Sequence, residues 1–365
     1  MSKRIFVLDL FRGMIVFVMI SFDLPPTTEI YPIVQHAAWE GLTIAEFPFP
    51  FFVLVMGMSA AVSYSRKPAS FKKIFRRAGL LFLIGLIFND LPYVFMYMVQ
   101  ENFSAADFYT IGIEHWRIFG ILQRFALTYA LGMLIVKFVE SDKKILGAAF
   151  LLLIISSMGF HIYSPDNPFD VNHNISGTID LIFPGANHIL TPTHDPEGLY
   201  GTLSATGEML IGFLSGKILV DNISVSEKFR NLLIFGAVIF LTGYVWSSVD
   251  IISKQIWTSP FSLITAGSGI ITTAFLLIIS DIFPIVQKIF KPIASLGKSP
   301  LLYFLGSVCG LIILSGTERW VWLWQVTFYD FISIPFGALL FCLTWATLWT
   351  VIATVIDKLG IVIKV

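Results

Sequence analysis

The chain has 365 residues, of which 56% are hydrophobic and 13% are charged, whereas a soluble domain carries about 25% charged residues. Its 24 basic and 24 acidic residues give a formal net charge of zero, which excludes a nucleic-acid-binding protein with a basic excess. Two cysteines are too few for a disulfide scaffold, and the apolar composition excludes a disordered chain and an ordinary soluble enzyme. We therefore expect an all-α membrane protein.

Ten segments have the length and apolar character of a membrane span, which needs about 20 residues. Their apolar runs are continuous, so they predict a polytopic helix bundle and not the alternating strands of a β-barrel. We expect one transmembrane domain over residues 1–365. The segments are 5–22, 47–64, 78–98, 118–138, 145–163, 201–220, 232–250, 261–283, 299–316 and 332–356.

The first segment contains two charged residues, Asp9 and Arg12, three positions apart and therefore on one helix face. Burying such groups in a membrane costs several kcal/mol, so each is a candidate functional residue. Two interpretations stay open: an ion pair that orients the helix, or a contact from Arg12 to a bound cofactor.

The connection before the second segment is rich in catalytic residue types. His36, Trp39, Glu40 and Glu46 lie within eleven positions, and Asp23 ends the first segment on the same side of the membrane. A histidine beside a carboxylate has the parts of a general base with its orienting partner. The alternative is a polar, aromatic helix entry at the membrane interface.

Gln123 and Arg124 lie about six residues inside the fourth segment. The planar guanidinium of arginine suits phosphate or carboxylate, so its depth favours a binding role over an arginine that extends to the interface.

The basic residues are distributed unequally between the two ends of the segments. Nineteen of the 24 lie at one set of ends, and only Arg117, Lys254 and Arg319 lie at the opposite set. The excess predicts that the first set, and with it both termini, is cytoplasmic. Six basic residues within 66–77 are expected to contact anionic lipid or, as a second role, a nucleotide phosphate.

The longest connection, residues 164–200, is polar and turn-rich and lies on the extracytoplasmic side. Loops of this length are usually functional or disordered. Its histidines and acidic residues have no spacing typical of a metal site, so no metal is expected.

The chain resembles the heparan-α-glucosaminide N-acetyltransferase family of membrane acyltransferases. The resemblance begins with RIFVLDLFRG at 4–13 and HAAWEGLT at 36–43, and four further stretches follow in the family's order. These are FGILQR at 119–124, DPEGLYGT at 195–202, SKQIWTSPF at 253–261 and LGKSPL at 296–301.

The resemblance implies acetyl transfer from cytoplasmic acetyl-coenzyme A to an extracytoplasmic amino sugar or related glycan, with His36 as the active-site histidine. Asp23 or Glu40 would orient the imidazole. Donor-binding candidates are Arg124, Gln123, Trp39, Lys254 and Arg12. Acceptor-binding candidates are Glu46, Asp195, Glu197 and Gly198.

Several positions depart from the family pattern. Glu40 and Asp23 stand where the family usually has Asn, and Glu46 stands for the usual Asp. The late stretch 305–307 lacks the histidine that often follows there. These changes leave the acceptor open, together with N- or O-acetylation and the choice between direct transfer and an acetyl-histidine route.

Other assignments also stay open at this stage. A proton-coupled small-molecule transporter is the alternative function, because charges within spans fit it too. A bacterial plasma membrane fits the short chain better than a lysosome, and the apolar spans allow a homodimer.

Overall fold

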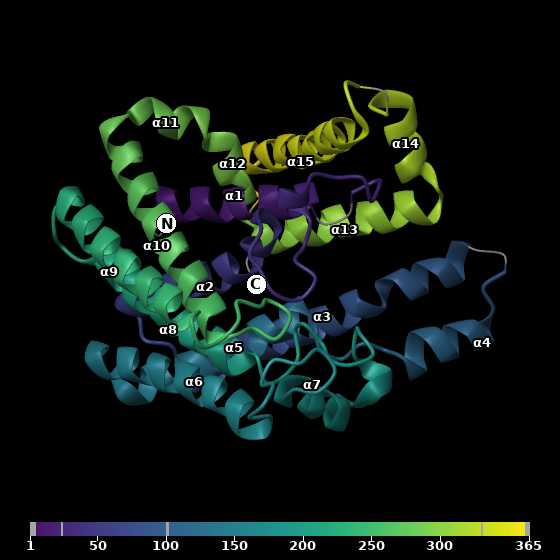
Figure 1. Cartoon of the computed structure of the whole chain (residues 1–365). Helices are drawn as coiled ribbons and strands as arrows, with labels where there is room; N and C mark the ends of the chain where they lie inside the picture. The colour runs from purple at the N-terminus through teal and green to yellow at the C-terminus, as the bar shows by residue number, and fades with distance from the viewer. Residues whose placement is uncertain (1–4, 23–24, 100–101, 330, 362–365) are drawn as a thin grey trace.

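The computed structural model describes residues 5–22, 25–99, 102–329 and 331–361, and within these ranges all regular structure is helical. The long helices form a bundle, shown in Figure 1. They are α1 (Phe6–Phe22), α2 (Pro48–Arg66), α3 (Phe71–Val99), α5 (Ile121–Val139), α6 (Asp142–Tyr163), α8 (Thr202–Val220), α9 (Val225–Trp246), α10 (Ser259–Ile282), α13 (Pro300–Gly316) and α15 (Ile334–Lys358).

Shorter helical turns occur in the connections. They are η1 (Pro32–Val34), η2 (Ile44–Glu46), α4 (Ala105–Asp107), η3 (Phe108–Glu114), α7 (Ile175–Asp180), η4 (Leu181–Gly185), η5 (Ala186–His188), α11 (Pro284–Ile289), α12 (Lys291–Leu296) and α14 (Arg319–Thr327).

Each of the ten predicted segments overlaps one long helix, so the predicted polytopic bundle is confirmed, although fewer than ten of these helices qualify as spans among the described residues. Within the described ranges, eight helices are long and apolar enough to cross a membrane, and a ninth span results if α13 and α14, bent by 88°, are counted together. Helix α1 has 17 residues. The chain is thus an integral membrane protein.

Two helices begin earlier than the apolar runs suggest. Helix α3 begins at Phe71, seven residues before the predicted start at 78. The prediction was late because the first turns of α3 carry basic residues, which hydropathy alone does not assign to a span. Helix α9 begins at Val225 and not at 232, because Ser224 and Glu227 form a capping box that satisfies the free N–H groups there.

Helix α8 lies at the centre of the bundle, and 15 of its 19 residues are buried. It packs against α2, α5, α6 and α10. The approach to α2 is close enough that a Cβ at Gly57 would overlap the Met209 carbonyl, and one at Gly212 would overlap the Leu54 carbonyl. Small residues at helix crossings provide this close packing in membranes.

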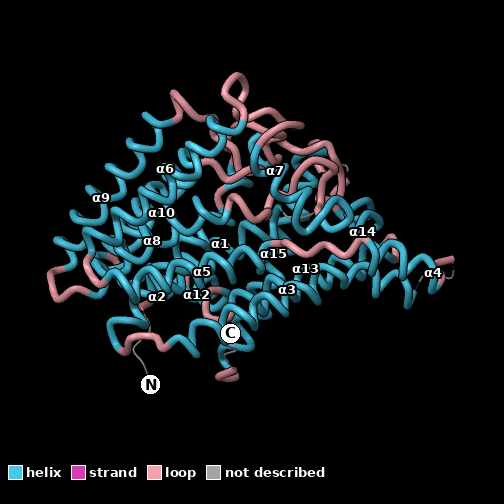
Figure 2. Tube along the Cα trace, turned by 90° about the horizontal axis from the view of Figure 1, so that it is seen from below, coloured by secondary structure: helices cyan, strands magenta, loops and turns pink. Residues whose placement is uncertain are grey.

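The chain ends lie on one side of the bundle, and the longest loop lies on the other. Helix α1 near Asp9 packs against Gly297, and the next residue, Lys298, pairs with Asp357 near the end of α15 at 2.6 Å. Figure 2 shows the loops gathered around α7, away from both ends. The long 164–200 connection, which contains α7, therefore lies on the side of the bundle away from the Lys298–Asp357 pair (Figure 2).

Candidate active site

His36 lies in the connection between η1 and η2 and contacts a buried carboxylate. Its Nδ1 atom is 2.7 Å from Oε1 of Glu46. The His36 side chain is 52% exposed, whereas that of Glu46 is 1% exposed. One edge of the imidazole is therefore held by a protected anion while the ring remains accessible from the loop-rich face.

The Glu46 carboxylate is fixed by its own loop. Its oxygens accept hydrogen bonds from the Ala37 N–H at 3.1 Å, the Thr43 N–H at 2.9 Å and the Thr43 hydroxyl at 2.5 Å. Glu46 ends η2, directly ahead of the proline-containing start of α2. This anion is positioned before any ligand arrives, which is what an orienting partner for a base requires.

Of the two predicted orienting residues, the structure describes only Glu40. Glu40 is exposed, and Asp23 lies outside the described residues. Glu46, which the sequence assigned to acceptor binding, is the carboxylate that contacts the ring. Sequence spacing could not identify this pair, because His36 and Glu46 are ten positions apart and the loop between them must close first.

Lys254 approaches the same imidazole from the α9–α10 connection. Its Nζ atom is 3.4 Å from Nδ1 of His36. Two residues earlier, the Ile252 carbonyl accepts the Gly41 N–H at 2.8 Å, which joins the two loops. An ammonium group here can stabilise negative charge that develops beside His36.

Trp39 joins the His36 loop to the long 164–200 connection. Its indole N–H donates to the Phe169 carbonyl at 2.9 Å, and its ring meets that of His194 edge-on at 5.2 Å. Burial lowers the pKa of His194 below its usual value. Trp39 thus contributes to the shape of the loop layer around His36.

A buried ion cluster fixes the DPEG stretch of the long connection. Arg117 donates to Asp195 at 2.9 and 2.6 Å and also to Glu197. Although burial opposes its charge, the carboxylates of Glu197 and Asp195 raise the pKa of Arg117. The sequence did not predict that Arg117 binds these carboxylates. The available signal was that Arg117 is a basic residue on the face of the membrane that carries few basic residues.

Asp180, at the end of α7, also stabilises this loop by accepting hydrogen bonds from its backbone. Its carboxylate accepts the Asp195 N–H and the Leu199 N–H, each at 3.0 Å. Burial raises the pKa of Asp180 to about 6. A Cβ at Gly198 would overlap this carboxylate, so the turn requires glycine for space.

Arg124 and Gln123 are both buried, at 1% and 0% exposure. Arg124 donates to the Gly198 carbonyl at 2.7 Å and lies over the Trp257 ring at 4.7 Å. Arg124 therefore links α5 to the loop of Gly198 and to the segment that carries Lys254. The donor-binding role of these two residues stays a prediction.

Glu208, in the middle of α8, is a second buried charge that sequence analysis missed. It is 0% exposed, and its Oε1 accepts from Thr265 at 3.3 Å. A carboxylate inside the apolar run 201–220 was the available signal.

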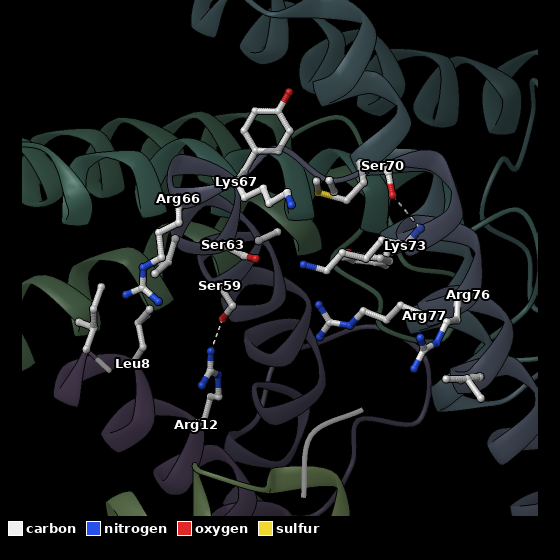
Figure 3. A pocket seen from close by; sticks show the side chains of 18 of the residues that line it. Leu8, Arg12, Ser59, Ser63, Arg66, Lys67, Ser70, Lys73, Arg76 and Arg77 are labelled. Atoms are coloured by element: carbon white, nitrogen blue, oxygen red, sulfur yellow. Dashed lines mark hydrogen bonds between the residues drawn. The ribbon is translucent and has the colours of Figure 1, made fainter. Parts of the chain in front are cut away.

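A large cationic cavity opens at the opposite face, where α1, α2 and α3 meet. Its volume is about 860 Å³, and we call it the basic vestibule. Asp9 is the acidic residue in its lining, and it pairs with Arg12 at 3.0 Å. Figure 3 shows several of these side chains around the cavity. The cations that line it are Arg12, Arg66, Lys67, Lys72, Lys73, Arg76, Arg77 and Lys298.

The basic vestibule continues into an apolar cavity of about 380 Å³. Arg12, Ser59, Arg77 and Lys298 line both spaces. The second cavity extends along α1, α2 and α5 to Ile121 at the start of α5, which is the end nearer the loop layer. A route therefore leads from the basic face into the half of the bundle that is nearer the loop layer.

A chain of aromatic rings leads from this route toward the segments that carry Glu46 and Lys254. Phe125 is 6.0 Å from Phe52 and 5.1 Å from Phe49, and Phe49 is 4.8 Å from Trp257, measured between ring centroids. We call these four residues the aromatic barrier. Phe49 follows Glu46 by three positions, and Trp257 follows Lys254 by three, so the barrier adjoins both partners of His36.

The arrangement suits base or nucleophilic chemistry at the loop-rich face. A half-exposed imidazole with a fixed anionic partner can take a proton or carry an acyl group. In the described part of the chain, no group of three or more His, Cys, Asp or Glu residues is placed to hold a metal ion.

Comparison with known proteins supplies the remaining evidence. Residues 4–243 match the family model described as heparan-alpha-glucosaminide N-acetyltransferase, catalytic. The chain is 26% identical over 276 residues to the mouse protein named heparan-alpha-glucosaminide N-acetyltransferase, and 26% identical over 277 residues to the human protein of that name. Each match covers 60% of this chain and 39% of the relative's length. The matched family region includes His36, Glu46 and Arg117 but ends before Lys254.

Proposed function

Because this chain belongs to the heparan-alpha-glucosaminide N-acetyltransferase family, we propose that it moves an acetyl group from cytoplasmic acetyl-coenzyme A to an amino sugar or related glycan at the opposite membrane face. The observation that carries the proposal is the route from the basic vestibule through the apolar cavity toward His36.

The charge of the basic vestibule supports a nucleotide-bearing donor. Coenzyme A carries a 3′-phosphate and a diphosphate, and eight cations against one carboxylate match such a polyanion. Arg76 and Arg77 supply guanidinium forks for phosphate oxygens, and Lys72 and Lys73 supply point charges. The donor's nucleotide would remain at this face.

The apolar cavity supports the path of the thioester. Its 380 Å³ would hold the thin arm that joins the nucleotide to the acetyl group, with the thioester directed toward Phe125. The large charged part then need not cross the bilayer. Only the acetylated end of this arm has to reach past the aromatic barrier, so that its thioester carbon meets the attacking group.

At the far side, His36 would perform the proton or acyl transfer. In direct transfer, the acceptor nitrogen or oxygen attacks the thioester carbon, its proton passes to His36, and the C–S bond breaks. In the acetyl-histidine route, the imidazole nitrogen of His36 attacks the thioester carbon and the C–S bond breaks, which releases the thiolate of coenzyme A; the acceptor then attacks the acetyl carbon, the C–N bond breaks, and the acceptor proton passes to the released imidazole. Glu46 holds the ring and balances its positive charge in either route, and Lys254 stabilises the developing oxyanion.

The first experiment replaces His36 with Ala and measures labelled acetyl transfer to an amino sugar. We expect turnover to fall by about 10²–10⁴-fold, the usual contribution of a general base. Donor binding, followed by thermal stabilisation with acetyl-coenzyme A, should persist. His115→Ala, an exposed histidine outside the site, is the matched control. Unchanged turnover in His36→Ala would refute the assignment.

The donor site is tested separately with Arg76→Gln and Lys73→Gln. Each should weaken the affinity for acetyl-coenzyme A, followed by thermal stabilisation, by about tenfold or more, because a charge-assisted hydrogen bond contributes about 1.5–3 kcal/mol. Arg319→Gln, on an exposed surface of another helix, should not. If saturating acetyl-coenzyme A stabilises no form of the protein, the proton-coupled transporter, which the buried charges Arg124 and Glu208 also fit, becomes the better proposal.

A further inference from the structure

A second large cavity lies at the same face as the basic vestibule and takes no part in the proposed reaction. Its volume is about 900 Å³, and it lies among the ends of α2, α5, α6, α8 and α9. We call it the interfacial pocket. Tyr64 of α2 lines both this pocket and the basic vestibule, and its ring packs against Phe213 at 5.8 Å. The two cavities are therefore neighbours on opposite sides of one aromatic wall.

The inner part of the interfacial pocket is apolar. Helices α6 and α9 both pack on the central helix α8, and the floor between them contains Ile145, Phe213 and Ile218. On their outer sides α6 and α9 present exposed apolar residues, including Leu151 at 57% and Ile234 at 57% exposure, as expected of helices that face hydrocarbon. The floor of the pocket thus lies between two lipid-facing helices.

The rim of the pocket carries charges of both signs. The carboxylates are Glu140, Asp142 and Asp221, and the ammonium groups are Lys143 and Lys217. Asp142 and Lys217 form an ion pair across the pocket's edge, from the start of α6 to the end of α8. Three negative and two positive groups contrast sharply with the eight cations of the basic vestibule, so this pocket does not suit a second polyanionic donor.

We propose that the interfacial pocket binds a phospholipid with a primary-amine headgroup from the leaflet at the basic face. Its ammonium would interact with Glu140 and Asp221, its phosphate with Lys143 and Lys217, and one acyl chain would cover the apolar floor. A quaternary ammonium has no N–H to donate to the carboxylates. A purely anionic headgroup would meet three carboxylates. Phosphatidylethanolamine therefore fits the rim better than phosphatidylcholine or phosphatidylglycerol.

The test compares these three lipids with identical acyl chains on delipidated full-length protein. Retention in native mass spectrometry and thermal stabilisation should both rank phosphatidylethanolamine first, by about five- to tenfold in apparent affinity. Equal binding of all three, or a preference for phosphatidylglycerol, would overturn the proposal. The measurement does not require acetyl transfer, so the outcome is independent of the proposed function.

Variants assign the preference to this pocket. The exposed pair Glu140→Gln and Asp221→Asn should reduce phosphatidylethanolamine affinity to that of phosphatidylcholine. Ile218→Trp, which fills the floor, should weaken binding of both lipids. Lys72→Gln with Lys73→Gln, in the neighbouring basic vestibule, should leave the preference intact. Retention of the preference in the carboxylate variant, or undiminished lipid binding in Ile218→Trp, would contradict the proposed site.

Discussion

Replacing Arg117 with Met should loosen the loop that carries Asp195, Glu197 and Gly198 without unfolding the bundle. Arg117 is the cation that contacts both buried carboxylates, and Asp195 is 0% exposed. Methionine retains the apolar stem of the side chain but supplies no charge. Two carboxylates would then remain in a buried environment without their partner.

The expected cost follows from the burial of these groups. Removing one partner of a buried ion pair typically destabilises a protein by about 3–5 kcal/mol. The Arg117 side chain is 21% exposed, so water screens part of the interaction and about 3 kcal/mol is the appropriate figure. The loss should be local, because a loop can open without disrupting the helices beneath it.

Hydrogen exchange measures this loss directly. Amides of residues 195–199 should exchange about 100-fold faster in Arg117→Met, since 1.4 kcal/mol corresponds to a factor of ten, whereas amides of α8 should not change. Arg319→Met, the same change at an exposed arginine, is the control. Unaltered protection of 195–199 would refute the idea that Arg117 holds this loop.

Two further predictions concern the same loop. Gly198→Ala should severely impair acetyl transfer and the protection of loop amides from hydrogen exchange, because the added methyl overlaps the Asp180 carboxylate. Gly79→Ala is the control and should be tolerated, because no atom lies within 4 Å of the new Cβ. Equal behaviour of the two variants would contradict the steric argument. Burial raises the pKa of Asp180 from 3.8 to about 6, so its contribution to loop stability is complete below about pH 4 and is lost as pH rises through about 6. The free energy of loop opening, from exchange corrected for intrinsic rates, should therefore fall by about 2 kcal/mol between pH 4 and pH 7, and this component should vanish in Asp180→Asn.

The helices were predictable because each span is a long apolar run. Such a run is visible in consecutive residues and does not depend on contacts between distant parts of the chain. The exceptions are instructive. The first turns of α3 were missed because Lys72, Lys73 and Arg76 face the basic vestibule, so their polarity reflects a site and not the end of a span. Capping at Ser224 likewise begins α9 within polar sequence.

The sequence indicated which reactive residues belong to the site but not which of them contact one another. His36 and Lys254 were recognised as candidates, but they are separated by 218 positions and meet only when two loops pack together. Arg117 and Asp195 are separated by 78 positions. Such pairs depend on tertiary packing, and local spacing indicates only that reactive groups are present.

The aromatic barrier also has an electrical consequence. Charged groups line the basic vestibule on one side, the exposed His36 loop lies on the other, and the apolar cavity and the aromatic barrier lie between them. Moving one elementary charge across a membrane involves about 2.3 kcal/mol per 100 mV of transmembrane voltage. An acetyl group is neutral and does no work against this field, whereas the donor phosphates would. Apolar and aromatic side chains between a cationic chamber and a histidine thus suit the proposed transfer of an uncharged group, on which the membrane voltage does no work.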